Sequence, residues 1–208
     1  MGVWLICFII NSIHVQNEPF LAGCQFHRRA RQIANRIMKD ITVLFMNRIA
    51  IIGSSGSGKS TFANKLGKKL NRPVIHLDKE YYMSDWKEKF PVKSDWLEFQ
   101  RKLVAGDEWI IDGNYRSSIA IRLGRADTVI FFDFSKWLCL WRAFKRVFNR
   151  EQPFDKPDGM RERISWELIK RVVVYPTEEI YRILEGYKRS AKIIVVKNDK
   201  EVRKLLDG

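Results

Sequence analysis

Long apolar runs, paired cysteines and nucleic-acid-binding signatures are all missing from this sequence. Residues 3–10 form an apolar run of only eight residues, far below the roughly 20 that cross a bilayer as a helix, and no basic residue precedes it as in a signal peptide. The three cysteines, Cys7, Cys24 and Cys139, have neither metal-site nor redox spacing, which predicts free thiols in a reducing cytoplasm. No helix-turn-helix, zinc-finger or RNA-binding motif is present. The sequence therefore predicts no membrane span and no sequence-specific DNA-binding module.

Acidic residues are few relative to basic ones. The chain of 208 residues carries 38 Lys and Arg against 24 Asp and Glu, for a formal net charge of +14. Residues 1–45 hold five of the basic and two of the acidic residues, so a charge of +11 belongs to the remainder. A basic surface suits polyphosphate substrates and nucleic acid alike, and charge alone does not distinguish them. The apolar content of 46% is enough for one domain with a proper core.

The stretch from Gly53 to Ser60 satisfies the pattern G-x-x-x-x-G-K-[ST] in full. A β-branched apolar run, 48–52, precedes it, and a helical pattern, 59–70, follows it. In a strand–loop–helix unit of this kind, backbone N–H groups and the helix N-terminus form an anion site for phosphates. Lys59 would then reach the β- and γ-phosphates of ATP, and the Ser60 hydroxyl would ligate Mg²⁺. We therefore expect an ATP site made by Gly53, Ser54, Ser55, Gly56, Ser57, Gly58, Lys59, Ser60 and Thr61.

Strand-like and helix-like segments alternate through residues 47–207. The strand-like runs are short and apolar, as in buried parallel strands, and lie at 48–52, 73–78, 108–112, 128–133 and 192–196. Helical patterns occupy the stretches between them. This alternation predicts an α/β fold of three layers, in which a five-stranded parallel sheet is covered by helices on both faces.

Three of the expected strands end in a carboxylate, and ligands of open α/β sheets bind at the carboxyl ends of strands. Asp112 is placed like the Walker B aspartate that holds Mg²⁺, and Asp133 has the same context and competes for that role. We favour Asp112, because Arg116 follows in the same turn and adds phosphate-binding capacity, and we interpret Asp133 as a strand-end cap. Asp78 suits acceptor binding, help with the metal or a loop cap, whereas His76 lies in an apolar run and suits the core.

The helix expected at 136–150 is doubly patterned. Arg142, Arg146 and Arg150 repeat every four residues on one face, while Trp137 and Trp141 begin an apolar stripe on another. Arginine binds phosphate oxygens in bidentate fashion, so at least one of these arginines is expected to act on the transferring phosphoryl group. A solvated basic face is the alternative.

One domain, residues 46–208, is expected, with an aromatic-rich insertion at about 79–94 and a lid-like region at about 136–160. The insertion either covers an acceptor or packs onto the core. Residues 1–45 are interpreted as an N-terminal extension outside the domain, with Met46 as the functional start, one short strand before the glycine loop. A basic helix at 25–41 gives the extension an alternative role at a membrane surface or a partner.

Taken in order, these motifs resemble those of P-loop kinases of the adenylate-kinase-like group, and more closely those of the bacterial proteins labelled DNA topology modulation proteins. The resemblance covers roughly residues 47–197. The segments that carry it are 51–60, 76–78, 109–116, 125–134 and the arginine helix. Adenylate kinases read Asp-Gly-Phe-Pro-Arg after the third strand, and this chain reads Asp112-Gly113-Asn114-Tyr115-Arg116.

The resemblance implies ATP, Mg²⁺ and phosphoryl transfer, with Arg116 as the arginine for an acceptor phosphate and an acceptor other than AMP itself. The lid arginines of the group map onto Arg142 and Arg146. The expected catalytic residues are Lys59, Asp112, Arg116, Arg142 and Arg146, the metal site is Ser60 with Asp112, and Asp78 and Arg116 face the acceptor.

Two functional hypotheses follow. The first is a small-molecule kinase with a nucleotide-type acceptor, in which Asp78 is the candidate base if the acceptor group is a hydroxyl. The alternative is an ATP-dependent regulatory switch that affects DNA topology through the basic surface.

Overall fold

The computed structural model describes residues 46–85, 87–148, 155–157 and 165–207. By its internal contacts the chain divides into two units, residues 1–42 and 43–208, and all described residues belong to the second. The expectations for the extension at 1–45, its basic helix and Arg150 therefore lie outside the described residues. No helix in the described part is both long and apolar enough to span a membrane.

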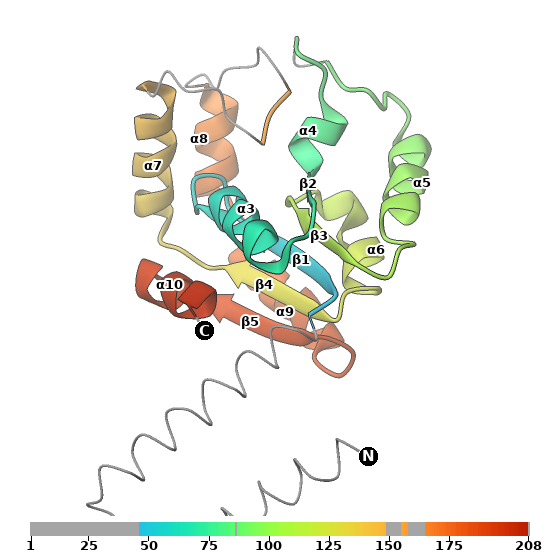
Figure 1. The fold of residues 1–208 in the computed structure, drawn as a ribbon. Coiled ribbons are helices and arrows are strands. Elements are labelled where there is room, and N and C mark those ends of the chain that lie inside the picture. Colours follow the sequence, from blue (N-terminus) through green and yellow to red (C-terminus); the bar gives the residue numbers. More distant parts are fainter. Residues whose placement is uncertain (1–45, 86, 149–154, 158–164, 208) are drawn as a thin grey trace, which may run out of the picture. The chain divides into compact units, whose positions relative to one another are not determined.

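Five parallel strands form one sheet in the described part of the chain, in the order β2-β3-β1-β4-β5 (Figure 1). The strands are β1 (Arg48–Gly53), β2 (Val74–His76), β3 (Trp109–Asp112), β4 (Thr128–Phe132) and β5 (Lys192–Val196). β1 is central, and its residue Ile51 pairs with Asp112 of β3 on one side and Ile130 of β4 on the other. Because the strands are parallel, the carboxyl ends of β3 and β4 flank the loop that follows β1.

Helices cover both faces of this sheet (Figure 1). They are α3 (Lys59–Leu70), α4 (Leu77–Tyr81), α5 (Lys93–Leu103), η2 (Arg116–Ser118), α6 (Ile119–Leu123), α7 (Lys136–Phe148), α8 (Trp166–Val173), α9 (Thr177–Tyr187) and α10 (Asp199–Asp207). Alternate residues of β1 enter two separate apolar clusters, as the period of a strand requires. Ile52 packs in one with Leu184 of α9, and Ile51 packs in the other with Phe62 and Leu66 of α3. The predicted three-layer α/β fold is confirmed.

The second strand is shorter than expected, and this moves Asp78. β2 ends at His76, and Asp78 lies in the first turn of α4 rather than at a strand end. Leu77 fixes the start of this turn, because its fully buried side chain packs against Gly113, where an added Cβ would lie 2.7 Å from the Leu77 Cβ. β2 thus ends just before the residue that makes this close contact.

The aromatic insertion packs onto the core. The ring of Tyr81 contacts those of Trp96 and Tyr115, with centroids 4.8 and 4.9 Å apart, and Phe90 stacks in the same group. Such contacts add to the area that each ring buries. These rings therefore pack onto the core, which is one of the two alternatives for the insertion; covering an acceptor is the other.

The amphipathic helix α7 turns its arginines inward. Arg142 reaches the carbonyl oxygen of Ser57 in the glycine loop at 3.3 Å, whereas Trp137 and Trp141 are 70% and 65% exposed. Trp137 and Trp141, which begin the apolar stripe read from the sequence, therefore do not pack against the sheet. The side of α7 that faces the glycine loop carries Arg142 instead.

Candidate active site

The glycine loop between β1 and α3 depends on backbone that other residues rarely adopt. Gly56 and Gly58 have φ angles of 78° and 89°. A Cβ on Gly56 would lie 2.1 Å from the carbonyl oxygen of Cys139, so the loop and α7 approach each other too closely for any side chain there. Lys59 and Ser60 then begin α3, which directs a helix N-terminus and its partial positive charge at the loop.

A cavity of about 250 Å³ lies over this loop, walled by the ends of β1, β2 and β3, by α8 and by residues 155–156. Of the residues predicted for the site, those that line it are Gly53, Ser55, Lys59, Ser60, Asp78, Asp112 and Arg116. The structure thus brings the phosphate loop, the expected metal pair and the expected acceptor residues to one cavity. Ser54 lines a neighbouring cavity instead, and the exposed Thr61 lines neither.

Asp112 lines the cavity and is almost fully buried. Its Oδ2 lies 2.9 Å from His76 Nδ1, and the other ring nitrogen of His76 lies 3.1 Å from Asn64 Oδ1 on α3. The second carboxylate oxygen, Asp112 Oδ1, has no hydrogen-bond partner among the described residues. A buried carboxylate oxygen without a donor, in a cavity that Ser60 also lines, suits an oxygen-seeking cation such as Mg²⁺.

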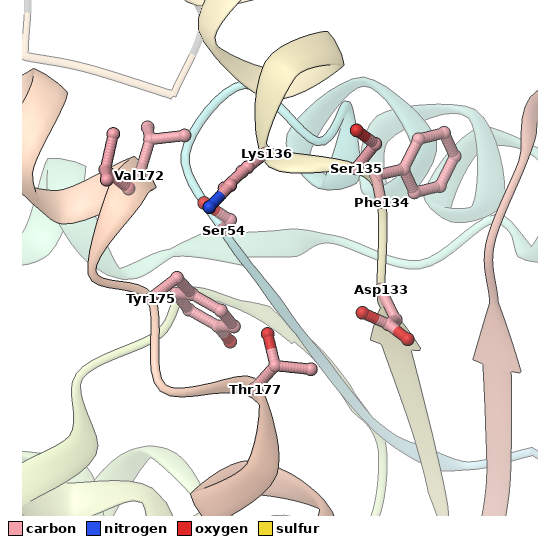
Figure 2. A pocket seen from close by; sticks show the side chains of 9 residues that line it. Ser54, Asp133, Phe134, Ser135, Lys136, Val172, Tyr175 and Thr177 are labelled. Atoms are coloured by element: carbon pink, nitrogen blue, oxygen red, sulfur yellow. The ribbon is translucent and has the colours of Figure 1, made fainter.

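Asp133, the competing candidate, lines a different cavity of about 360 Å³ together with the loop residue Ser54 (Figure 2). Its Oδ2 accepts a hydrogen bond of 2.7 Å from the Tyr181 hydroxyl on α9. Burial and this carboxylate raise the pKa of Tyr181 to about 12, so the phenol remains a donor. Just after the end of β4, Asp133 thus binds the Tyr181 hydroxyl of α9, and its interpretation as a strand-end cap stays a prediction.

Asp78 is the most strongly perturbed carboxylate of the cavity. Its Oδ1 accepts a hydrogen bond of 3.0 Å from the Tyr115 hydroxyl, and its Oδ2 pairs with the ammonium of Lys156, whose side chain is only 6% exposed. Burial alone would raise the pKa of Asp78, but the positive charges of Lys156 and Lys59 together with the two hydrogen bonds lower it to about 2. Such a carboxylate is a fixed negative charge and a poor proton acceptor at neutral pH.

Arg116 stands at the cavity mouth and is paired with Glu179 of α9 at 2.8 Å. The turn that carries it is held from behind by Arg122, a fully buried arginine that the sequence reading missed. Arg122 donates to Gln100 Oε1 at 2.7 Å, to Ser118 Oγ at 3.0 Å and, at 3.4 Å, to the carbonyl oxygens of Gly113 and Tyr115. Burial lowers the pKa of Arg122 to about 10, which leaves it charged at neutral pH.

The two lid arginines do not line the cavity. Arg142 joins the Ser57 carbonyl to Asp199 Oδ2, the latter at 2.6 Å, and so braces the glycine loop against α10. Arg146 lies 3.9 Å from Asp155 Oδ2. Asp155 lines the cavity beside Lys156, so α7 contacts the wall of the site without entering it.

Several residues of the site escaped the sequence reading. Lys156 and Arg171 come from segments with no motif, and Tyr175, which donates to Asn114 Oδ1 at 3.0 Å, lies between two helices. His76 was assigned to the core, where it is indeed buried, but it also bonds Asp112. Of these residues, only His76 could have been linked to the site from the sequence, because it lies near the end of a predicted strand, two residues before Asp78. In the structure it pairs with Asp112 of β3.

Solved structures of kinases share this fold. The chain is 15% identical to shikimate kinase from Acinetobacter baumannii, solved with shikimate, over 80% of this chain and 92% of that one, with a TM-score of 0.50. Lower scores relate it to a sugar kinase from Janibacter sp. HTCC2649 (14% identity, 78% and 91% covered, TM-score 0.43). Deoxyadenosine kinase from M. mycoides with bound dATP gives 18% identity, 76% and 95% covered, and a TM-score of 0.46.

At such identities the likeness establishes the fold and not the activity. No protein-family model matches the chain, and no curated protein matches it. With a TM-score of 0.50, the likeness to shikimate kinase supports the α/β fold seen here, a five-stranded parallel sheet covered by helices on both faces.

Proposed function

We propose that the chain is an ATP-dependent kinase of a small molecule. The observation that carries the proposal is one cavity that holds Lys59 and Ser60 of the glycine loop, the buried carboxylate of Asp112 and the charged pair of Asp78 and Lys156. A P-loop kinase needs these three parts: a cradle for the ATP phosphates, a carboxylate for the metal and a charged acceptor side.

In this reading the protein acts by positioning and by charge. Lys59 and the N-terminus of α3 hold the β- and γ-phosphates, and Arg142 keeps the loop in shape through the Ser57 carbonyl. Arg116, at the cavity mouth, faces an acceptor phosphate or another anionic group. Arg146 holds the segment at Asp155. In this proposal Arg142 and Arg146 support the walls of the site. They do not themselves neutralise the charge on the transferring phosphoryl group.

Ser60 and Asp112 would hold Mg²⁺, which supplies neutralisation of phosphate charge when it is bound. Their donor atoms are a hydroxyl and a carboxylate oxygen, which are the hard ligands that Mg²⁺ prefers. The described residues contain no group of three or more His, Cys, Asp or Glu that would hold a metal alone. A shared site, completed by the phosphates of the nucleotide, is the usual arrangement for this ion.

Other parts of the sequence reading stay predictions. They are the nucleotide-type acceptor, the closer likeness to DNA topology modulation proteins, the ATP-driven switch acting on DNA, and the cytoplasmic location. The kinase is the function that the cavity over the glycine loop supports best.

The test is ADP release by the full chain with ATP and Mg²⁺, alone and with nucleoside monophosphates, nucleosides, sugars and small phosphorylated or carboxylated metabolites. The proposal expects turnover that an acceptor stimulates and that Lys59→Ala abolishes. Tight ATP binding with slow hydrolysis that no acceptor accelerates would overturn the kinase and favour the switch.

A further inference from the structure

The aromatic residues Tyr81, Phe90, Trp96 and Tyr115 do not line the cavity, although the Tyr115 hydroxyl reaches Asp78. Tyr81, Phe90 and Trp96 pack on one another, with ring centroids 4.8 to 6.5 Å apart, and the Tyr115 ring lies against Trp96 at 5.0 Å. Among the described lining residues, Tyr175 is the single one with a phenol or indole ring, and its hydroxyl is already donated to Asn114. The cavity therefore offers no pair of ring faces between which a nucleobase would stack.

The cavity is also small and polar. Its volume of about 250 Å³ lies below the roughly 300–1,000 Å³ of typical ligand pockets, and part of it belongs to the γ-phosphate over Lys59. Val174 and Pro176 are its only aliphatic lining residues among those described. An acceptor that fits must be small and must present polar groups in several directions.

Two of the four Lys and Arg side chains that line the cavity, Lys59 and Arg171, form no ion pair with a carboxylate of the described residues, and Lys59 is assigned to the ATP phosphates. Arg116 is paired with Glu179, and Lys156 with Asp78. Arg171 of α8 is exposed, and its Nε has only the backbone carbonyl of Glu167, at 3.4 Å, as a partner; no carboxylate of the described residues lies within ion-pair distance of it. The charge of Arg171 acts on Glu167, one turn earlier on α8, without an ion pair between them, so the guanidinium at the cavity wall remains a binding group for a carboxylate or a phosphate.

Asp78 presents the complementary group. Its side chain is 37% exposed, so a ligand in the cavity reaches it. Tyr115 and Lys156 occupy one position on each oxygen, and a carboxylate accepts about four hydrogen bonds, so capacity remains for a donor from a ligand. Asp78 and Arg171 both line this one cavity, so a single small ligand there has both groups in its surroundings.

We propose that the acceptor is a small anionic alcohol without a nucleobase, whose anionic group binds Arg171 and whose hydroxyl is oriented by Asp78. This inference rests on the proposed kinase function. In the reaction the acceptor oxygen bonds to the γ-phosphorus of ATP while the bond from that phosphorus to the β,γ-bridging oxygen breaks. ADP leaves with the bonding pair, and the hydroxyl proton passes to water. Asp78 acts as a hydrogen-bond acceptor that positions the hydroxyl.

The test compares four acceptor classes with the full chain, ATP and Mg²⁺: sugar acids and other hydroxy acids, sugar phosphates, neutral sugars, and nucleosides with their monophosphates. The inference expects that hydroxy acids or sugar phosphates stimulate ADP release. Stimulation by hydroxy acids alone would identify the anionic group of the acceptor as a carboxylate, and stimulation by sugar phosphates alone would identify it as a phosphate. Equal or better turnover with nucleosides or nucleoside monophosphates would overturn the inference and keep the kinase. Equal turnover with neutral sugars would overturn the role of the anion.

Arg171→Ala provides the residue-level arm, with Lys170→Ala as the matched control, since Lys170 is exposed on the same helix and does not line the cavity. Loss of a charge-assisted pair is expected to raise the KM for the anionic acceptor by about tenfold or more, with the KM for ATP unchanged. An Arg171→Ala enzyme that behaves like Lys170→Ala would overturn the assignment. A chain that no acceptor of any class stimulates would overturn the proposed function itself, which is a distinct outcome.

Discussion

The two halves of the cavity are built in opposite ways. The phosphate side is one continuous stretch, Gly53 to Ser60, whose shape depends on backbone angles and on the first turn of α3. The acceptor side is assembled from side chains of α4, the turn after β3, residue 156 and α8. The first half is a local structure and the second a tertiary one. Changes in the loop should therefore act on ATP, and changes in the assembled half should act on the acceptor.

The largest effect is expected for Lys59→Ala. It removes the loop cation that faces the phosphates, and the loss of such electrostatic stabilisation costs about a thousandfold in kcat/KM for ATP. The measurement is ADP release, with thermal unfolding as a check on the fold. Lys65→Ala, exposed and on the same helix, is the control and should retain full activity. Comparable loss in both variants would contradict a specific role for Lys59.

Arg122→Met tests whether the assembled half depends on a buried support. The change leaves Gln100 and Ser118 without their partner, and the unfolding free energy should fall by about 3 kcal/mol. Urea denaturation measures this fall. The exposed Arg101→Met should change stability by less than about 0.5 kcal/mol. In the surviving folded enzyme, the KM for the acceptor should rise more than that for ATP; an equal rise would mean that Arg122 supports both halves.

Asp78→Asn separates the halves more directly. Because the amide no longer orients an acceptor hydroxyl or balances Lys156, acceptor-dependent kcat/KM should fall by about 10- to 100-fold. ATP affinity should be unchanged or tighter, since a negative charge near Lys59 is removed. Steady-state kinetics and ATP titration give the two quantities. The exposed Asp85→Asn is the matched control.

Asp78 also predicts a pH dependence of stability. Its pKa in the folded protein, about 2, lies below the ordinary 3.8, so its contribution is present above 3.8 and is lost as pH falls towards 2. The difference in urea midpoint between the wild-type chain and Asp78→Asn should stay constant from neutral pH down to that ordinary value and shrink below it. A difference that already shrinks near neutral pH would show that the carboxylate is not held by Lys156.

The smallest effect is expected for Glu179→Gln. The ion pair with Arg116 is exposed, and such pairs contribute about 0–1 kcal/mol. Stability should barely change, while the release of Arg116 should lower the KM for an anionic acceptor by no more than about threefold. A loss of activity larger than that of Asp78→Asn would mean that the pair holds the cavity mouth in shape.

Sequence reasoning succeeded where structure is local. The strand pattern predicted the five parallel strands, and the motif at Gly53 to Ser60 predicted the loop, because adjacent residues make both. It was wrong about the end of β2, which it placed at residue 78 and the structure places at His76; the next residue, Leu77, contacts Gly113, which is far away in the chain. The positions of Lys156 and Arg122 could not be predicted from any spacing in the sequence. A charged side chain is buried only where residues distant in the chain supply its partners.

The most direct test measures ATP affinity and acceptor-stimulated turnover in Lys59→Ala and Asp78→Asn side by side. The account predicts that Lys59→Ala loses both, and that Asp78→Asn binds ATP at least as tightly as the wild-type chain while losing most acceptor-dependent turnover. Loss of ATP affinity in Asp78→Asn as large as in Lys59→Ala would contradict the division of the cavity into a phosphate side and an acceptor side.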